Sequence, residues 1–441
     1  MYGGKCVQNP ISNKFFIKEG KQKSNEKYGL ISYLEYFFND MYRETDYNYA
    51  LSYQRVKSIK TRIDQLKSEI LEGVQVRSKV QEIKYGEVPS SFLVGKQSSE
   101  GKKKIINKLT TEQCFDNINV GLDLDHTNDI NKYVHSYYKN IYMSQENDIS
   151  VQNEFINFLE PTVSEVDNEM LTKPLDLDDI YKALNSTENH KSPGIDGLPY
   201  EFFKTFWDIL KDDLLEILTY ALTNLSVTES QSLGIITLQP KSGDKKLLSN
   251  WRPITLMTCD YKLLTKIFAN RLKCIVPQII SKEQFCCPGK SIIDSNLVMR
   301  DVLYYCNENN IQGAVLTLDW SKAYDRVDHN FLYAVLGKLG FCEAFIKVIQ
   351  LFCSNVQSAV QVNGIITKSF DIGRGIRQGC PLSMILYVLF KEALYCRIKS
   401  SQSIKSPYLP NNHSLKILGY ADDTNLFLRD SQSILEAMKY D

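Results

Sequence analysis

Two adjacent aspartates between two short apolar runs constrain the fold of this chain more than any other sequence feature. The stretch SLKILGYADDTNLFLRD covers residues 414–430 and has Asp422 and Asp423 at its centre. The flanking runs, 415–418 and 425–428, have the length and composition of β-strands bounded by polar residues. The sequence therefore predicts a hairpin that presents both carboxylates at or near its turn.

The simplest explanation of this pair is turn chemistry, because aspartate tolerates left-handed geometry and can bond its own backbone. One aspartate would be enough for a turn. Two carboxylates that approach to about 4 Å repel each other by roughly 4 kcal/mol at an effective dielectric of about 20. Solvent or a bound cation must offset this repulsion, so a plain turn and a cation site both stay open.

A third carboxylate follows another predicted strand. The segment GAVLTLDWSKAYDRVDHNFL (313–332) begins with an apolar run over 314–318, and Asp319 comes directly after it. Asp319 could cap the helix that the next residues predict, or it could face the hairpin across a shared sheet. Because neighbouring side chains of a strand point to opposite faces, only one hairpin aspartate can fully share the face of Asp319. This predicts one firm metal ligand and one accessory ligand.

Carboxylates that converge in this way suit Mg²⁺, a hard ion that takes oxygen ligands and completes its shell with water and substrate phosphates. Two such ions roughly 3.5 to 4 Å apart can activate an attacking hydroxyl and stabilise a leaving pyrophosphate. Asp319, Asp422 and Asp423 therefore predict a site for two Mg²⁺ ions, with Mn²⁺ as a substitute.

Composition narrows the class of protein. The chain has 441 residues, 43% hydrophobic and 24% charged, which is typical of a globular protein with two or three domains. Lys+Arg and Asp+Glu balance at 52 each, so net charge gives no evidence for nucleic-acid binding. No apolar run has the length of a membrane span, and the N-terminus lacks a signal-peptide core. We expect no membrane partner and an intracellular location, cytoplasmic or nuclear.

The pattern along the chain predicts several segments. Residues 1–50 show no sustained period. Residues 51–109 predict a basic amphipathic helix followed by a Gly/Ser/Lys-rich linker. The helix could pack on its own domain or form a short coiled coil. Residues 110–178 read as a helical linker region. After residue 178, helices alternate with short strands, which indicates an α+β core. The 11 cysteines lack a paired C-x-x-C, so we interpret them as reduced core thiols.

Two further stretches contain candidate substrate-binding groups. LQPKSGDKKLLSNWRPITLM (238–257) has Lys241 in a turn and Arg252 before a proline, where an arginine fork can bind phosphate oxygens. GRGIRQGCPLS (373–383) places Gln378 and Gly379 in a glycine-rich turn before a helix. Gly379 would allow close approach to a nucleotide, although a plain turn explains it equally well.

Five motifs occur in a fixed order: KSPGIDGLPYEFFK, PKSGD with NWRPITL, LDWSKAYDRVDH, GIRQGCPLS and GYADD. In this order they resemble the reverse transcriptase of non-LTR retrotransposons of the long interspersed element type. The resemblance implies an α+β right-hand polymerase with fingers over 179–312 and a palm over 313–441. Helices would pack on a small antiparallel palm sheet, preceded by a helical N-terminal extension. The implied activity is RNA-directed DNA synthesis from dNTPs on a primer 3′-hydroxyl.

The resemblance also implies roles for single residues. Asp319 and Asp422 would bind the catalytic metals with help from Asp423. Tyr324 matches the aromatic steric gate that excludes a ribose 2′-hydroxyl, a role compatible with a core aromatic. The remaining candidates fall into two groups: a nucleotide-binding set, Lys241, Arg252, Gln378 and Gly379, and a basic face for the phosphates of the RNA template and DNA primer, Lys262, Lys266, Arg271 and Lys273.

The sequence also departs from the family pattern. Lys290 stands where arginine is usual, and Met384 and KEAL (391–394) stand where the family more often shows proline and an E-P-L-like sequence. The chain ends soon after Asp423, so we expect a fragment without thumb or endonuclease, whose activity on its own is a separate question.

Two other functions stay open. An inactive retroelement remnant would act only as an RNA-binding or protein-binding module. An intron-encoded or viral RNA-copying polymerase would share the metal chemistry, but Tyr324 favours deoxynucleotides, and SPGIDG and NWRPITL favour the retrotransposon type.

Overall fold

The structure is a computed structural model of the chain and describes residues 58, 61–62, 65, 105–115 and 119–438. The amphipathic helix predicted after residue 51 falls outside the described residues apart from four helical positions, and most of the basic linker also lies outside them. Ile106–Asp441 form one compact unit.

The compact unit mixes helices with short strands. Its helices are α4 (Thr127–Tyr142), α5 (Ile149–Ile156), α6 (Glu165–Thr172), α7 (Leu177–Asn185), α8 (Tyr200–Thr205), α9 (Trp207–Asn224), α10 (Glu229–Ser232), α11 (Cys259–Ile279), α12 (Ile292–Glu308), α13 (His329–Leu339), α14 (Glu343–Cys353), α15 (Ser383–Ser400) and α16 (Ser431–Ala437). Its strands are β1 (Leu109–Thr110), β2 (Asp123–Leu124), β3 (Leu233–Pro240), β4 (Trp251–Leu256), β5 (Ala314–Leu318), β6 (Gln357–Val362), β7 (Ile365–Ile366), β8 (Phe370–Asp371), β9 (Ile417–Tyr420) and β10 (Asp423–Leu428).

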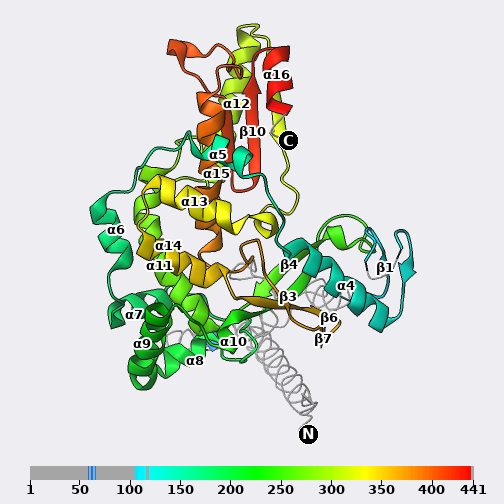
Figure 1. Cartoon of the computed structure of the whole chain (residues 1–441), viewed down its shortest axis with the longest axis vertical. Helices are drawn as coiled ribbons and strands as arrows, with labels where there is room; N and C mark the ends of the chain where they lie inside the picture. Colours follow the sequence, from blue (N-terminus) through cyan, green and yellow to red (C-terminus); the bar gives the residue numbers. More distant parts are fainter. Residues whose placement is uncertain (1–57, 59–60, 63–64, 66–104, 116–118, 439–441) are drawn as a thin grey trace, which may run out of the picture. The chain divides into compact units, whose positions relative to one another are not determined.

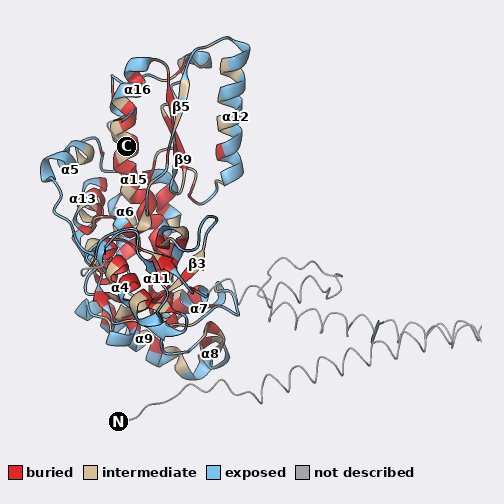
Figure 2. Ribbon diagram, turned by 90° about the vertical axis from the view of Figure 1, so that its right-hand side faces the viewer, coloured by how far each residue is buried: buried red, intermediate tan, exposed pale blue. Residues whose placement is uncertain are grey.

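The predicted hairpin and the predicted strand form one antiparallel sheet in the order β5-β10-β9. This confirms the strand over 314–318 and the hairpin around the two aspartates. Leu318 of β5 and Leu426 and Leu428 of β10 are buried together with Ile417 and Tyr395. Figure 2 shows α15 and α16 on one side of this sheet and α12 on the other. Helices packed on a small antiparallel sheet are the expected α+β arrangement.

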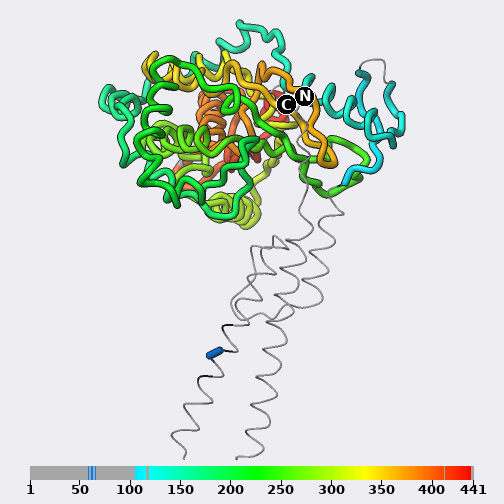
Figure 3. The backbone as a smooth tube through the Cα atoms, turned by 90° about the horizontal axis from the view of Figure 1, so that it is seen from below, coloured from blue at the N-terminus to red at the C-terminus, as the bar shows by residue number. Residues whose placement is uncertain are grey.

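A second sheet has the order β4-β3-β6-β7, with β8 paired to β6, and β3 and β6 run parallel. Helix α4 lies alongside β6 and β8, as Figures 1 and 3 show. Its aromatic side chains Tyr133, Tyr138 and Tyr142 are buried in a core with Trp251 and Phe370. Because α4 supplies this core, the segment 110–178 is part of the body of the unit, which corrects its assignment to a linker.

Helix α11 runs through the largest core of the described chain. Residues on all of its sides are buried, among them Leu264, Phe268 and Leu272. It packs against α6, α7, α9 and α15. Such a helix is hydrophobic around most of its circumference, unlike a surface helix with one apolar stripe. The same core extends to α13 and α14, so the predicted fingers and palm share one hydrophobic interior.

The ten cysteines that the structure describes are free thiols. Cys259, Cys286, Cys287 and Cys353 are buried, as expected of core thiols, whereas Cys114 and Cys274 are exposed. Among the described helices, none combines the length and the apolar character that a bilayer span requires.

Gly419 of β9 gives a direct test of the sheet packing. A Cβ at this position would lie 2.4 Å from the Tyr395 hydroxyl oxygen and 2.5 Å from the carbonyl oxygen of Asp423. We expect Gly419→Ala to lower the free energy of unfolding by about 2 kcal/mol, because overpacking displaces neighbouring atoms. At Gly337 of α13 a Cβ would meet only Ile346, at 3.8 Å. Urea denaturation should show Gly337→Ala neutral or stabilising by up to about 1 kcal/mol; equal effects would contradict the packing.

Candidate active site

The sheet β5-β10-β9 brings the three predicted carboxylates to one end. Asp319 follows the last residue of β5, and Leu318 pairs with Thr424 of β10. Extending this register by one pair places Asp423 opposite Asp319, because paired residues of antiparallel strands share a face. Asp422 lies in the two-residue turn between β9 and β10. All three aspartates are exposed.

The structure removes the two simpler explanations for these residues. The helix after Asp319 is capped by Asp328, whose side chain accepts a hydrogen bond from the Phe331 backbone, so Asp319 is not the cap. In the hairpin turn the residue with positive φ is Ala421, at 51°. Within the described chain, neither Asp422 nor Asp423 bonds the turn through its side chain. The turn geometry therefore does not account for the two aspartates.

The donor set suits a divalent cation of the Mg²⁺ type. Among the described residues, no three Asp, Glu, His or Cys side chains lie close enough together to form a metal-holding group. Mg²⁺ does not need such a group, because it usually binds through one or two carboxylates and completes its shell with water and substrate phosphates. Asp319, Asp422 and Asp423 supply exposed oxygen ligands at one sheet end, which fits this mode of binding.

A buried lysine lies directly behind the hairpin turn. Lys391 of α15 is 4% exposed, and its Nζ donates hydrogen bonds to the Ala421 carbonyl oxygen at 2.8 Å and to Thr424 Oγ1 at 2.7 Å. Burial lowers the pKa of Lys391 to about 8, while the carboxylates of Asp422 and Asp423 act in the opposite direction. The sequence showed KEAL only as a departure from the family pattern; burial beside the hairpin could not be read from it.

Tyr324 lies beside the hairpin as well. Its ring stacks on Tyr387 of α15, with centroids 4.6 Å apart and an angle of 26° between the planes. Burial raises the pKa of Tyr324, and the nearby Asp422 carboxylate adds to the increase. Tyr324 is half-buried against the main core, so the packing role exists in this structure and a role as steric gate stays a prediction.

Asp325 is a buried acid that the sequence analysis missed. It is 1% exposed and accepts a hydrogen bond from the Tyr142 hydroxyl of α4 at 2.8 Å. Gln378 donates to the same carboxylate at 3.3 and 3.4 Å. Burial raises the pKa of Asp325, and these donors lower it again. The acid was visible in the AYDR motif, but its partners come from segments far away in the sequence.

The glycine-rich turn is explained mainly by backbone packing. Gly379 has a φ of +107°, and a Cβ there would lie 2.7 Å from the Thr255 carbonyl oxygen. The Thr255 amide donates to the Gln378 carbonyl at 2.8 Å, so this turn is bonded directly to β4. The plain turn explanation therefore accounts for Gly379, and its contact with a nucleotide stays a prediction.

Lys241 and Arg252 lie at the same end of the β3–β4 pair. Arg252 pairs with Gln239, and the Lys241 backbone amide donates to the Asn250 carbonyl at 2.8 Å. Both side chains are exposed. Burial raises the pKa of Asp325, and the positive charge of Lys241 is one of several groups that lower it again. The second sheet thus carries two exposed cations at one end, and their contact with a nucleotide stays a prediction.

The expected basic face of α11 is only partly formed. Lys262 is 8% exposed and lies over the Tyr200 ring, and Arg271 is 6% exposed. The Arg271 guanidinium donates to three backbone carbonyls of 171–174 and to Asp179 Oδ2 at 2.7 Å. Both side chains are buried here and Arg271 is bonded within the protein, so this structure does not favour a phosphate contact for either, and that role stays a prediction. Lys266 and Lys273 remain partly exposed.

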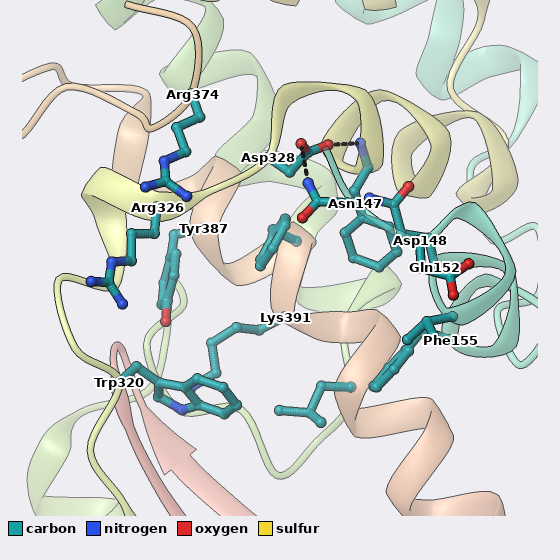
Figure 4. A pocket seen from close by; sticks show the side chains of 14 residues that line it. Asn147, Asp148, Gln152, Phe155, Trp320, Arg326, Asp328, Arg374, Tyr387 and Lys391 are labelled. Atoms are coloured by element: carbon teal, nitrogen blue, oxygen red, sulfur yellow. Dashed lines mark hydrogen bonds between the residues drawn. The ribbon is translucent and has the colours of Figure 1, made fainter. Parts of the chain in front are cut away.

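A cavity of about 420 Å³ opens next to the buried lysine. Figure 4 shows Trp320, Tyr387 and Lys391 at one side of it and Phe155 of α5 at the other. Across the cavity, Asn147 donates to Asp328 Oδ2 at 2.7 Å and ties the segment before α5 to the start of α13. No pattern in the sequence indicated this cavity, because its walls come from four separate segments.

Comparisons with known proteins agree with the geometry. Residues 239–440 match the family model described as reverse transcriptase (RNA-dependent DNA polymerase). The chain is 33% identical over 362 residues, 81% of its length, to the transposon TX1 uncharacterized 149 kDa protein of Xenopus laevis. It is 30% identical over 200 residues, 45% of its length, to a retrovirus-related Pol polyprotein from the type-1 retrotransposable element R2 of Popillia japonica.

A third similar protein is the probable RNA-directed DNA polymerase from transposon BS of Drosophila melanogaster, 25% identical over 230 residues, which are 51% of this chain. The alignments cover 27%, 28% and 25% of these three relatives, respectively. The chain thus spans about a quarter of the length of the curated relatives that it matches.

Arg271 and Lys273 of α11 test the corrected basic face. We expect Arg271→Met to lower the free energy of unfolding by about 2 to 4 kcal/mol, because it removes the buried guanidinium that pairs with Asp179 and donates to the carbonyls of Leu171, Lys173 and Pro174. Lys273→Met on the same helix should change it by less than about 0.5 kcal/mol. Urea denaturation measures both values. Unchanged stability of Arg271→Met together with weaker RNA binding would restore the original interpretation.

Proposed function

Because this chain belongs to the reverse transcriptase (RNA-dependent DNA polymerase) family of non-LTR retrotransposons, we propose that it copies an RNA template into DNA by adding dNTPs to a primer 3′-hydroxyl. The observation that supports this most is that β5 and the β9–β10 hairpin bring Asp319, Asp422 and Asp423 to the same end of one sheet. Three exposed carboxylates at one place have no structural role in the described contacts. A role in binding cations and substrate explains why they lie together.

In this proposal the three aspartates hold two divalent ions, Mg²⁺ or Mn²⁺. When bound, such ions neutralise phosphate charge and lower the pKa of an attacking hydroxyl. The chain itself orients the carboxylates: β5 fixes Asp319, and the turn between β9 and β10 fixes Asp422. Orientation of reacting groups accounts for a large part of the rate gain in such reactions.

The nucleotide would lie between the hairpin and the second sheet. Lys241 and Arg252 are exposed cations that can bind triphosphate oxygens, and the arginine can do so with two parallel hydrogen bonds. Gln378 is held by Asp325 and thereby kept in one orientation beside this space. Tyr324 would contact the sugar. In this proposal, the dNTP is the substrate, and the hybrid of RNA template and DNA primer is the nucleic acid that the chain binds.

Two partly exposed lysines give weaker support for a surface that binds the RNA template. Lys266 and Lys273 lie on α11, and each can contact phosphates without reading sequence. Double-stranded hybrids of A-like shape are bound largely through backbone contacts of this kind. We therefore expect binding of the template to weaken steadily with added salt.

Primer extension on an RNA template with dNTPs and Mg²⁺ tests the proposed activity. We expect Asp319→Asn and Asp422→Asn to lower the extension rate at least about 100-fold, because each removes an ionised metal ligand. Asp301→Asn, an exposed site on α12, serves as control and should keep full activity. Circular dichroism confirms that all variants are folded. A parent chain that binds RNA but extends no primer would favour the binding-module function instead.

Sugar selection tests Tyr324. Replacement by valine opens space beside the sugar, so we expect Tyr324→Val to raise the use of ribonucleotides relative to deoxynucleotides roughly tenfold. Tyr324→Phe keeps the ring and should retain the discrimination of the parent. The ratio of kcat/KM for the two substrates measures the effect. Equal ratios in all three proteins would exclude Tyr324 as the gate.

A further inference from the structure

The buried ammonium of Lys391 binds the hairpin on both sides of the two aspartates. Its bonds to the Ala421 carbonyl oxygen at 2.8 Å and to Thr424 Oγ1 at 2.7 Å reach the residues directly before and after Asp422 and Asp423. Lysine has three donors and no acceptor, so it can hold two oxygens of one turn at once. The turn is thereby fixed from the side that faces α15.

Thr424 connects this lysine to the strand that delivers Asp319. Its hydroxyl accepts from Trp320 Nε1 at 3.0 Å and lies 3.3 Å from the Asp422 carbonyl oxygen, to which it can donate. A hydroxyl offers one donor and two acceptor positions, and these contacts use all of them. Trp320 directly follows Asp319. One hydrogen-bond network, buried or partly buried, thus joins both segments that hold the predicted metal ligands.

Aromatic rings lie close to the Lys391 ammonium. Nζ lies 5.7 Å from the ring centroids of both Tyr387 and Tyr395, and Figure 4 shows the side chain between Tyr387 and Trp320. A buried cation costs stability unless it is hydrogen-bonded or paired. The hydrogen bonds from Lys391 to the aspartate hairpin therefore offset part of the free energy that burying its ammonium costs.

We propose that Lys391 is a positioning residue that, through Ala421 and Thr424, holds Asp422 and Asp423 in the orientation that binds the cations. This inference rests on the proposed function, because it assigns a supporting role at the same site. Lys391 touches neither substrate nor metal in this role. Groups that orient metal ligands in this way typically contribute 10- to 100-fold to metal affinity or activity.

The variants Lys391→Met, Lys391→Arg, Thr424→Val and the double variant Lys391→Met/Thr424→Val separate positioning from general stability. Lys399→Met is the control, since Lys399 lies on the same helix but is 41% exposed and pairs with Glu283. Hydrogen exchange of the full chain without metal is the first measurement. We expect faster exchange in 417–428 for Lys391→Met but not for Lys399→Met, with α13 unchanged. Unchanged exchange in the hairpin would overturn the inference, whether or not the chain is active.

Binding of Mn²⁺, followed by electron paramagnetic resonance, gives a readout that loss of stability alone would not move. Positioning predicts roughly 10-fold weaker binding by folded Lys391→Met, a similar loss for Thr424→Val, and no further loss in the double variant. Lys391→Arg, which keeps charge and donors, should recover part of the affinity. If Lys391 acted only as a charge, its removal would tighten Mn²⁺ binding, and this result would overturn the proposal.

Primer extension separates this inference from the proposed function. We expect Lys391→Met to lower kcat about 10- to 100-fold with little change in the KM for dNTP, because the network orients the metal ligands rather than the nucleotide. A parent chain that neither binds Mn²⁺ nor extends primers would contradict the proposed function, while hydrogen exchange would still decide the role of Lys391.

Discussion

The antiparallel pairing of β5 with β10 is the contact on which the candidate active site depends. Its register runs from the pair Ala314–Leu428 to the pair Leu318–Thr424. A slip of one residue would turn every side chain of the strand to the other face. Leu318, Leu426 and Leu428 are buried on one face, so hydrophobic packing keeps the register in place. The position of the exposed carboxylates therefore follows from apolar side chains on the opposite face.

Two buried ionisable side chains hold together segments next to the candidate active site. Asp325 joins α4, through Tyr142, to the Gln378 turn, and Lys391 joins α15 to the hairpin. Each costs free energy of desolvation, which is offset only while its hydrogen bonds stay intact. Apolar residues of similar size would satisfy the packing at lower cost. Both side chains bond residues of the proposed site or its immediate neighbours, so we interpret them as groups that orient these residues.

The sequence predicted the sheet end because the necessary information is local. A strand that ends at Asp319 and a hairpin around Asp422 follow from alternating apolar residues and polar breaks. The motifs in their order then identified the family, and the comparisons agree. The features that could not be predicted are those that depend on which side chains become buried. The sequence predicts an exposed Arg271 because the spacing of apolar residues shows which side of a helix is apolar, but not how many other elements pack around that helix. Helix α11 is covered on most of its sides.

The same limit explains why the burial of Lys391 and of α4, whose helical character was predicted, did not follow from the sequence. A lysine on a helix is normally exposed, and only the approach of the hairpin, about thirty positions later in the sequence, buries this one. Its ammonium also changes the charge balance of the site. Three carboxylates and one protonated lysine leave a net charge of about −2, which one divalent cation would balance. A second cation would then be bound mainly with the negative charge of a triphosphate, in keeping with the preference of Mg²⁺ for substrate phosphates. In the proposed function, the nucleotide would therefore complete the cation site.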